Sequence, residues 1–281
     1  MPSTVTKKDI IKVCEDLGLK KTDTIIIHSS MKSFGYVEGG PTTVIEGFRE
    51  YLSEGTLCFP ALRQKNFGNS YKDWDINNTP SDVGFLSESF RKYPGVLRSD
   101  QETHSVTAIG VNAEYITSAH RGGKKRVCLY GDYAFSYTSP WQRICDIGGK
   151  VVFIGVPMKF NTMKHLVEST VVTDILDSIK DEAVRNAAYN EVSNCFAVPP
   201  RGATPSGRPC GFWFWYDGCK MQEHFEKMGL LTSAKCGDST IIVIEAKAFA
   251  TEWYNQLRYH YEDWVMDEDL LEWLEKYNPK N

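Results

Sequence analysis

The feature that most constrains the fold is a β-branched run that passes through a polar turn into a helix start. Three isoleucines at 25–27 are followed by His-Ser-Ser at 28–30, and a segment rich in Ser and Gly then leads to Pro41. Pro is favoured at the first position of a helix, because its fixed φ suits the helix and its missing N–H costs nothing there. The sequence therefore predicts a strand, a turn and a helix over residues 24–52.

The same alternation recurs along the chain. We expect strands at 24–28, 56–62, 106–109, 151–156 and 240–245. We expect helices at 7–17, 41–52, 83–93, 113–120, 161–179 and 222–228, and one through Phe249, Trp253 and Leu257. Strands that alternate with helices predict a sheet that is at least partly parallel. We therefore expect an α/β fold, with a mixed, partly parallel central sheet flanked by helices.

Residues 181–220 interrupt this alternation. They contain four prolines, several glycines and the aromatic run at 212–216. Side chains alternate along a strand, so these five aromatic residues cannot share one face. We interpret this segment as an irregular insertion, loop or hairpin, in a single domain that spans residues 1–281 and ends in an acidic helical tail at 262–281.

The strand-to-helix turn is also a candidate anion site. Backbone N–H groups and the positive end of a helix dipole bind phosphate groups at such junctions. The turn matches neither the P-loop nor the dinucleotide-binding pattern. It therefore predicts a ligand that carries phosphate but does not bind as an ordinary nucleotide, with Gly39 and Gly40 beside the phosphate.

A second motif lies at the start of the helix predicted at 161–179. Thr162, His165 and Glu168 are spaced by three residues, so they share one face near the helix N-terminus. A His with a carboxylate one turn away can act as an oriented general base. The alternative interpretation is a surface His–Glu pair.

Five motifs in order carry a resemblance to a known family. They are His28-Ser-Ser-x-x-Ser-x-Gly35, Thr79-Pro-x-x-x-Gly84, Arg98-Ser with His104-Ser-x-x-Ala-x-Gly110, Ser139-Pro140, and Asn161-Thr-x-x-His-x-x-Glu168. Over residues 5–260 the chain resembles the aminoglycoside 3-N-acetyltransferase family. The resemblance implies a mixed α/β fold, acetyl-CoA as donor and direct acetyl transfer to an amine.

The resemblance also implies roles for particular residues. His165 corresponds to the catalytic His, Glu168 lies beside it, and Thr162 is a further catalytic candidate. Asp75 and His104 are expected to contact the acceptor. His28 is ambiguous, since it either lines the site or ends a strand in the core. The residues expected to bind CoA are His28, Ser29, Ser30, Met31, Lys32, Ser33, Phe34, Gly35, Gly39, Gly40 and Ser105.

The sequence differs from the family pattern in two places. Gln101-Glu102 stand where His-Pro is usual, and the run 135–140 replaces the usual Phe-Gly-x-x-Ser-Pro. The window 180–235 carries seven basic and six acidic side chains, although a pocket for a polycation should be rich in carboxylates. The acceptor is therefore an aminoglycoside or a less cationic amino sugar.

Composition excludes several classes of protein and site. The net charge of −4 argues against a nucleic-acid binder, and no apolar run reaches the length of a membrane span. The N-terminal residues lack the apolar core of a signal peptide, so we expect a cytoplasmic protein. A homodimer is a separate expectation. The eight cysteines form no C-x-x-C pair and are expected to be reduced thiols. The spacing of Cys210, Cys219, His224 and Cys236 does not fit a zinc site, and no metal is expected.

The sequence alone leaves two other functions open. An acyl-CoA thioesterase would need Ser29 or Ser105 as a nucleophile, but the sequence shows no nucleophile elbow. A non-catalytic acyl-CoA-binding protein would keep the Ser-Gly turn without needing the His–Glu pair.

Overall fold

The central element of the structure is a seven-stranded mixed sheet with the strand order β5-β6-β4-β2-β7-β9-β8. The computed structural model describes residues 4–63, 73–128, 130–131, 133–196 and 217–278. At the centre β2 runs parallel to both β4 and β7, while β6 and β9 pair antiparallel on either side. The strands are β1 (Thr4–Val5), β2 (Thr24–Ser29), β3 (Tyr36–Val37), β4 (Thr56–Pro60), β5 (Leu97–Arg98), β6 (Val106–Gly110), β7 (Lys150–Ile154), β8 (Thr232–Cys236) and β9 (Ser239–Glu245).

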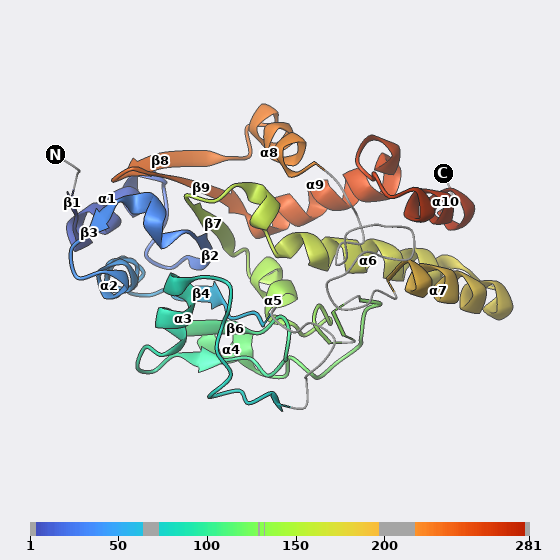
Figure 1. Cartoon of the computed structure of the whole chain (residues 1–281), viewed down its shortest axis with the longest axis horizontal. Coiled ribbons are helices and arrows are strands. Elements are labelled where there is room, and N and C mark those ends of the chain that lie inside the picture. Colours follow the sequence, from blue (N-terminus) through green and yellow to red (C-terminus); the bar gives the residue numbers. More distant parts are fainter. Residues whose placement is uncertain (1–3, 64–72, 129, 132, 197–216, 279–281) are drawn as a thin grey trace.

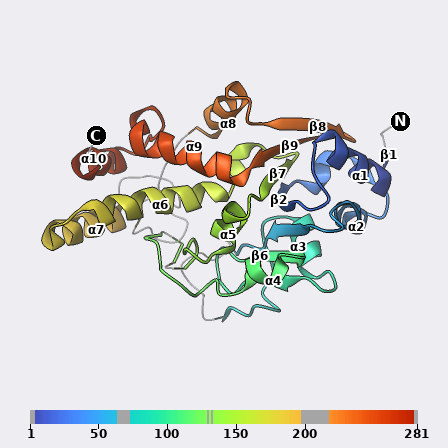
Figure 2. The same cartoon turned by 180° about the vertical axis from the view of Figure 1, so that it is seen from behind.

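Helices cover both faces of this sheet (Figures 1 and 2). The helices are α1 (Lys7–Asp16), α2 (Pro41–Tyr51), α3 (Phe85–Arg91), α4 (Ala113–Thr117), α5 (Pro140–Asp146), α6 (Met163–Ser178), α7 (Glu182–Phe196), α8 (Gly218–Lys227), α9 (Ala246–Tyr259) and α10 (Glu268–Tyr277), with short 3₁₀ turns η1 (Met31–Phe34), η3 (Met158–Phe160) and η4 (Tyr261–Asp263).

The alternation of side chains along β2 divides the core into two layers. Ile25 and Ile27 belong to the cluster that includes residues of α1, α2 and α3, whereas Ile26 belongs to the cluster with α5, α6 and α9. A strand buried on both faces needs apolar residues at consecutive positions, and the three isoleucines supply them. The predicted α/β fold with a partly parallel sheet is confirmed.

The prediction of an irregular insertion over 181–220 is wrong for its first part. Residues Glu182–Phe196 form helix α7, which packs on α10. Trp273 of α10 donates its Nε1–H to the backbone carbonyl of Ala188 at 2.9 Å, and the Tyr277 hydroxyl donates to Glu191 at 2.9 Å. Figure 1 shows the two helices side by side at one end of the molecule. The aromatic run 212–216 lies outside the described residues.

Because β2, β4 and β7 are parallel, their carboxyl ends meet at one edge of the sheet. Ser29 pairs in register with Ile154 at this edge, and β4 ends at Pro60 beside them. Ligands in α/β sheets bind outside the carboxyl ends of the strands. This edge is therefore where a site is expected.

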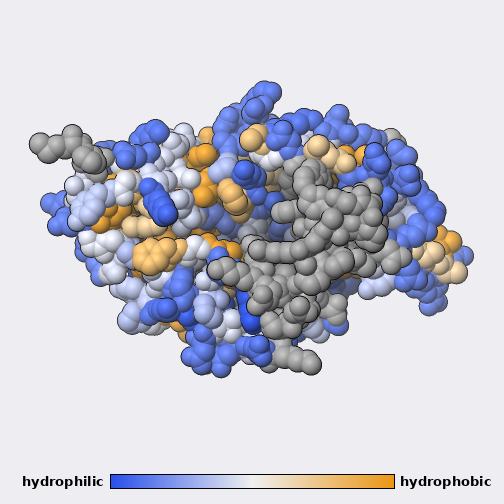
Figure 3. Space-filling model, in the orientation of Figure 1, coloured by the Kyte–Doolittle hydropathy of each residue, from blue (hydrophilic) through white to orange (hydrophobic). Residues whose placement is uncertain are grey.

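The surface seen in Figure 3 is mainly hydrophilic, with hydrophobic residues in separate small patches. Among the described residues, none of the helices combines the length and the apolar character needed to cross a membrane.

Candidate active site

His165 and Glu168 form a buried pair on the first two turns of α6. The Nδ1 atom of His165 lies 2.7 Å from Oε2 of Glu168, and the two side chains are 10% and 2% exposed. The i,i+3 spacing places both groups on one helix face, as the sequence predicts. Since Nδ1 faces a carboxylate, the neutral imidazole carries its proton there, and Nε2 keeps the lone pair that can accept a proton.

The surroundings of the pair are aromatic. The rings of Tyr130 and Phe135 lie 4.8 Å and 6.0 Å from the His165 ring, and His104 lies 6.1 Å away. Burial lowers the pKa of His165 below its ordinary value, while the Glu168 carboxylate opposes this shift. The imidazole is therefore neutral near pH 7 and ready to accept a proton.

A pocket of about 310 Å³ opens at the carboxyl ends of the parallel strands, beside the start of α6. Its volume is at the lower end of the ~300–1,000 Å³ that is typical of ligand sites. Two of the lining residues, His28 and Ser29, each have a buried polar atom. These atoms, Nε2 of His28 and Oγ of Ser29, have no hydrogen-bond partner in the described structure. The lining residues are His28, Ser29, Pro60, Leu62, Asp82, Val83, Ser87, Val156, Phe160 and Thr162.

His28 is expected either to line the site or to end a strand in the core, and it does both. Its ring stacks on Phe153 at 5.6 Å and on Trp141 at 6.3 Å, as a core side chain would. It also lines the pocket. Burial lowers the pKa of His28 to about 3, so the ring is neutral and its unpartnered nitrogen can serve only as a hydrogen-bonding group.

The turn that follows β2 is closely tied to the sheet. The Ser30 N–H donates to the carbonyl of Ile154 at 2.9 Å, and the Ser33 hydroxyl contacts both the Ser30 carbonyl and the Ser239 hydroxyl. Of the residues 28–40 predicted to bind CoA, only His28 and Ser29 belong to the described lining of the pocket.

The other predicted CoA-binding residues of the turn lie elsewhere. Phe34 is fully buried in the core between the sheet and the helices α1 to α3, and Met31 packs against the same core. Lys32, Gly35 and Gly39 are exposed. Gly35, Gly39 and Gly40 all have positive φ, which explains the need for glycine at these turns.

The Ser105 hydroxyl forms hydrogen bonds within the protein. Its hydroxyl donates to the Ala61 carbonyl at 2.8 Å and accepts from Arg98 at 3.0 Å. Gln101, which replaces the usual His of the family pattern, is buried and accepts hydrogen bonds from the backbone N–H groups of Thr103 and His104. These residues hold the loop that leads into β6.

The two residues predicted to contact the acceptor are in different places. His104 is buried beside His165, with its ring 4.4 Å from Tyr130. Asp75 is exposed, and its carboxylate accepts the N–H groups of Asn77 and Asn78 in a tight turn. The described contacts of Asp75 do not connect it with the His–Glu pair.

Several residues of the site carry no sequence signal of their own. Tyr130 and Phe135 are distant in sequence from His165, and Asp82, Val83 and Phe160 reach the pocket from loops and short turns. The sequence holds an indirect signal for three of them, since the Thr79-Pro-x-x-x-Gly84 motif brackets Asp82 and Val83, and Phe135 opens the run that corresponds to Phe-Gly-x-x-Ser-Pro.

None of the cysteines in the described residues forms a disulfide; they are Cys14, Cys58, Cys128, Cys145, Cys219 and Cys236. Burial raises the pKa of Cys14 and of Cys145 to about 12, which disfavours a thiolate nucleophile. No cluster of three or more potential metal ligands occurs in the described parts of the chain, and Cys210 of the zinc alternative lies outside them.

Several known proteins are similar to this chain in sequence. The family model described as aminoglycoside 3-N-acetyltransferase matches residues 26–257. A Bacillus subtilis relative, the SPbeta prophage-derived aminoglycoside N(3')-acetyltransferase-like protein YokD, is 25% identical over 89% of this chain and 92% of its own length. The aminoglycoside N(3)-acetyltransferase VII of Streptomyces paromomycinus is 28% identical, and the match spans 59% of this chain and only 60% of that protein.

Solved structures show the same fold. The structure described as AAC-IIIb binary with CoASH superposes with a TM-score of 0.68 and 20% identity, covering 95% of this chain and all of the other. A match of the family model over most of the sequence, together with the His–Glu pair at the start of α6, shows that the chain belongs to the aminoglycoside 3-N-acetyltransferase family.

Proposed function

We propose that this protein is an acetyl-CoA-dependent N-acetyltransferase that transfers the acetyl group directly to an amine of an aminoglycoside or a related amino sugar. The observation that carries the proposal is the buried His165–Glu168 pair beside a pocket at the carboxyl ends of the parallel strands. The names of the relatives support the same chemistry.

The chemical need is for a base. A thioester is already activated, but an acceptor amine is mostly protonated at neutral pH and cannot attack. His165 would take the proton on Nε2, and the Glu168 carboxylate would hold the ring and stabilise the imidazolium. A general base of this kind contributes ~10²–10⁴-fold to the rate.

The pocket suits an extended amide-bearing chain such as the arm of acetyl-CoA, which would supply the activated acetyl group. Pro60, Leu62 and Val156 provide apolar walls, and the unpartnered atoms of His28 and Ser29 provide hydrogen bonds for polar groups of the chain. Thr162, at the N-terminus of α6, joins the pocket to the His–Glu pair three residues later.

The sequence window 180–235 is not acidic, although a pocket for a polycation should be rich in carboxylates. The buried Lys164 lies next to the base in sequence, and its Nζ donates to the Lys159 carbonyl at 2.8 Å. A cation in this position disfavours a second ammonium group close to the reacting amine. An amino sugar with fewer positive charges therefore belongs in any test of the acceptor.

The test is an assay of thiol release by the purified protein with acetyl-CoA and a panel of amines. The panel contains an aminoglycoside, glucosamine and a simple alkyl amine. Thiol release that depends on the acceptor, with an N-acetylated product by mass spectrometry, supports the proposal. Release without an acceptor would indicate a thioesterase, and binding of acetyl-CoA without release would indicate a binding protein.

A further inference from the structure

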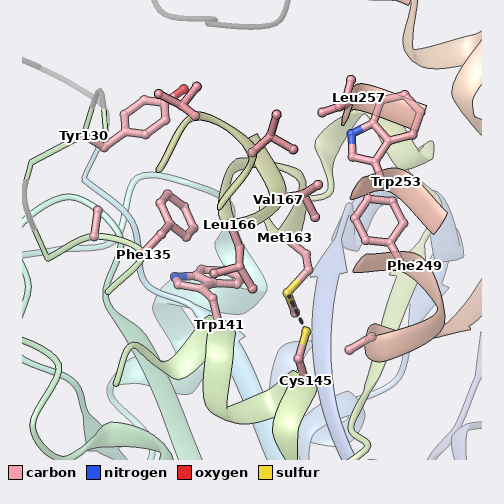
Figure 4. Packing of buried hydrophobic residues seen from close by; sticks show 14 of the residues in the cluster. Tyr130, Phe135, Trp141, Cys145, Met163, Leu166, Val167, Phe249, Trp253 and Leu257 are labelled. Atoms are coloured by element: carbon pink, nitrogen blue, oxygen red, sulfur yellow. Dashed lines mark hydrogen bonds between the residues drawn. The ribbon is translucent and has the colours of Figure 1, made fainter. Parts of the chain in front are cut away.

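Tyr130 contacts the one nitrogen of His165 that must accept a proton. Its hydroxyl oxygen lies 3.4 Å from Nε2 of His165, and its side chain is buried. The ring packs on His104 at 4.4 Å and on Phe135 at 6.2 Å. Figure 4 shows Tyr130 and Phe135 next to one another, on the opposite side of the hydrophobic cluster from Phe249 and Trp253.

The two nitrogens of His165 are held with very different strength. Nδ1 lies 2.7 Å from the Glu168 carboxylate, whereas the contact between Nε2 and the Tyr130 hydroxyl is long for a hydrogen bond. A reacting amine has to come within ~2.6–3.2 Å of Nε2. The amine would therefore take the place beside Nε2 and lie next to the hydroxyl.

Negative charge develops close to the same point. When the amine nitrogen bonds to the thioester carbon, the carbonyl oxygen attached to that carbon becomes an oxyanion. A hydroxyl that starts beside Nε2 is within reach of this oxygen. Burial raises the pKa of Tyr130 well above its ordinary value, so the hydroxyl keeps its proton and can donate.

The position of Tyr130 is fixed before any substrate binds. Its backbone carbonyl accepts a hydrogen bond from the Thr103 hydroxyl at 2.9 Å, and the ring is enclosed by His104 and Phe135. A donor held in place in a desolvated site stabilises charge more than water does, because it need not reorganise during the reaction. The buried Ser105 hydroxyl, by contrast, already donates to the Ala61 carbonyl at 2.8 Å.

We propose that Tyr130 is a catalytic residue whose hydroxyl donates a hydrogen bond to the oxyanion formed when the amine attacks the thioester. The inference rests on the proposed function. The reacting amine is the neutral form, whose extra proton has already passed to solvent by way of His165. As the N–C bond forms, the π electrons of the C=O bond move to oxygen, and one of the two remaining amine protons goes to Nε2 of His165. As the C–S bond breaks, the C=O bond forms again, and the imidazolium returns the proton to the sulfur. Tyr130 keeps its own proton throughout.

The test is Tyr130→Phe, which removes one oxygen atom and keeps the ring packing. We expect kcat/KM to fall ~10²-fold, since the loss of one oxyanion donor costs ~10²–10³-fold. The dissociation constant of CoA and the acid limb of the pH profile should not change, because the base remains. Tyr133→Phe is the matched control in the same loop, where the half-buried Tyr133 ring faces Lys125, and it should behave as wild type.

Unchanged activity of Tyr130→Phe would refute the assignment. An increase would refute it as well, because the hydroxyl would then only obstruct the acceptor. If Tyr130→Phe fails to fold by circular dichroism, 3-fluorotyrosine in place of Tyr130 changes the acidity of the phenol alone, and an unaltered kcat would overturn the proposal. Absence of acetyl transfer by the wild type would instead remove the proposed function, and this inference with it.

Discussion

Three histidines lie near the carboxyl edge of the sheet, and their partners give each a different role. His28 stacks on two aromatic rings, His104 contacts the Thr103 hydroxyl at 2.9 Å, and His165 contacts the Glu168 carboxylate. Burial lowers the pKa of all three. Of these three, only His165 has a carboxylate partner in the described structure, and a carboxylate is what stabilises an imidazolium during proton transfer.

Removal of the base should separate catalysis from binding. We expect His165→Ala to lower kcat by ~10²–10⁴-fold with little change in CoA affinity. Glu168→Gln should cost less, because the base remains and only its orientation is weakened. The matched control is His224→Ala, which removes the half-buried pair of His224 and Glu252 at 2.8 Å. Steady-state kinetics and calorimetry measure both effects, and near-normal turnover of His165→Ala would contradict the assignment.

The pH profile should report the lowered pKa of His165. In the proposed mechanism the active form is the neutral imidazole, so the rate should rise with pH through this pKa and level off above it. We expect the acid limb to lie below the ordinary value of ~6.5. The charged groups that act on the ring are Glu168, which raises its pKa, and Lys164, which lowers it.

Lys164→Met should therefore move the acid limb to higher pH, whereas Lys159→Met, which removes an exposed charge, should leave it in place. A limb that moves to lower pH in Lys164→Met would contradict the electrostatic argument. Kinetics between pH 5 and pH 8 with a saturating donor measure the shift.

At the scale of elements, the sequence is informative where local signals are strong. The isoleucines of β2 and the Pro41 helix start predict their elements within a residue or two. Helix α7 is not evident from the sequence because the prolines and glycines further along 181–220 indicate an irregular segment, although residues 182–196 contain neither. Strand β8 carries polar residues, since it is an edge strand that pairs only with β9, and so gives little periodic signal.

The candidate site was predictable only in part, for a related reason. The pair on α6 follows from helix periodicity, which is local. The approach of Tyr130 and Phe135 to His165 depends on how separate segments pack, and a single sequence does not specify that. The turn at 30–40 was recognised as a junction, but its side chains mostly stabilise the fold and do not line the pocket.

The glycine after β7 should be essential for the junction between strand and turn. Gly155 has a φ of +59°, and a Cβ there would collide with the Ser33 side chain. We expect Gly155→Ala to destabilise the fold by ~3 kcal/mol, from backbone strain and overpacking together. Gly148→Ala is the control, since its φ is +68° but no atom lies within 4 Å of the new Cβ, so it should cost only ~1–2 kcal/mol. Urea unfolding measures both, and equal losses would contradict the predicted collision.

At the scale of the whole molecule, buried neutral histidines should make stability depend on pH. Burial lowers the pKa of His28 to about 3 and of His120 to about 4, and lowers those of His104 and His165 as well. Between these values and ~6.5 the unfolded chain binds more protons than the folded one, so stability rises with pH. The stabilisation is complete above pH ~6.5 and is lost as the pH falls.

Each such group adds a slope of ~1.4 kcal/mol per pH unit within its window. We expect the free energy of unfolding, measured in urea, to fall steadily from pH 7 to pH 5. His28→Phe keeps a stacking ring without a titrating nitrogen and should reduce this slope. A free energy that does not change over this range would contradict the burial of these histidines.

The parallel pairing of β2 with both β4 and β7 has a consequence for synthesis of the chain. Strand β2 gains its first neighbouring strand from residues 56–58 but its second only from residues 150–154. During synthesis of the roughly one hundred residues between them, the backbone groups along one edge of β2 have no strand to pair with. An open strand of three isoleucines is a template for pairing with another chain. The ribosome-bound intermediate is therefore the form of this protein most exposed to aggregation, and slower translation or chaperone binding before β7 emerges should decide how much of it becomes active.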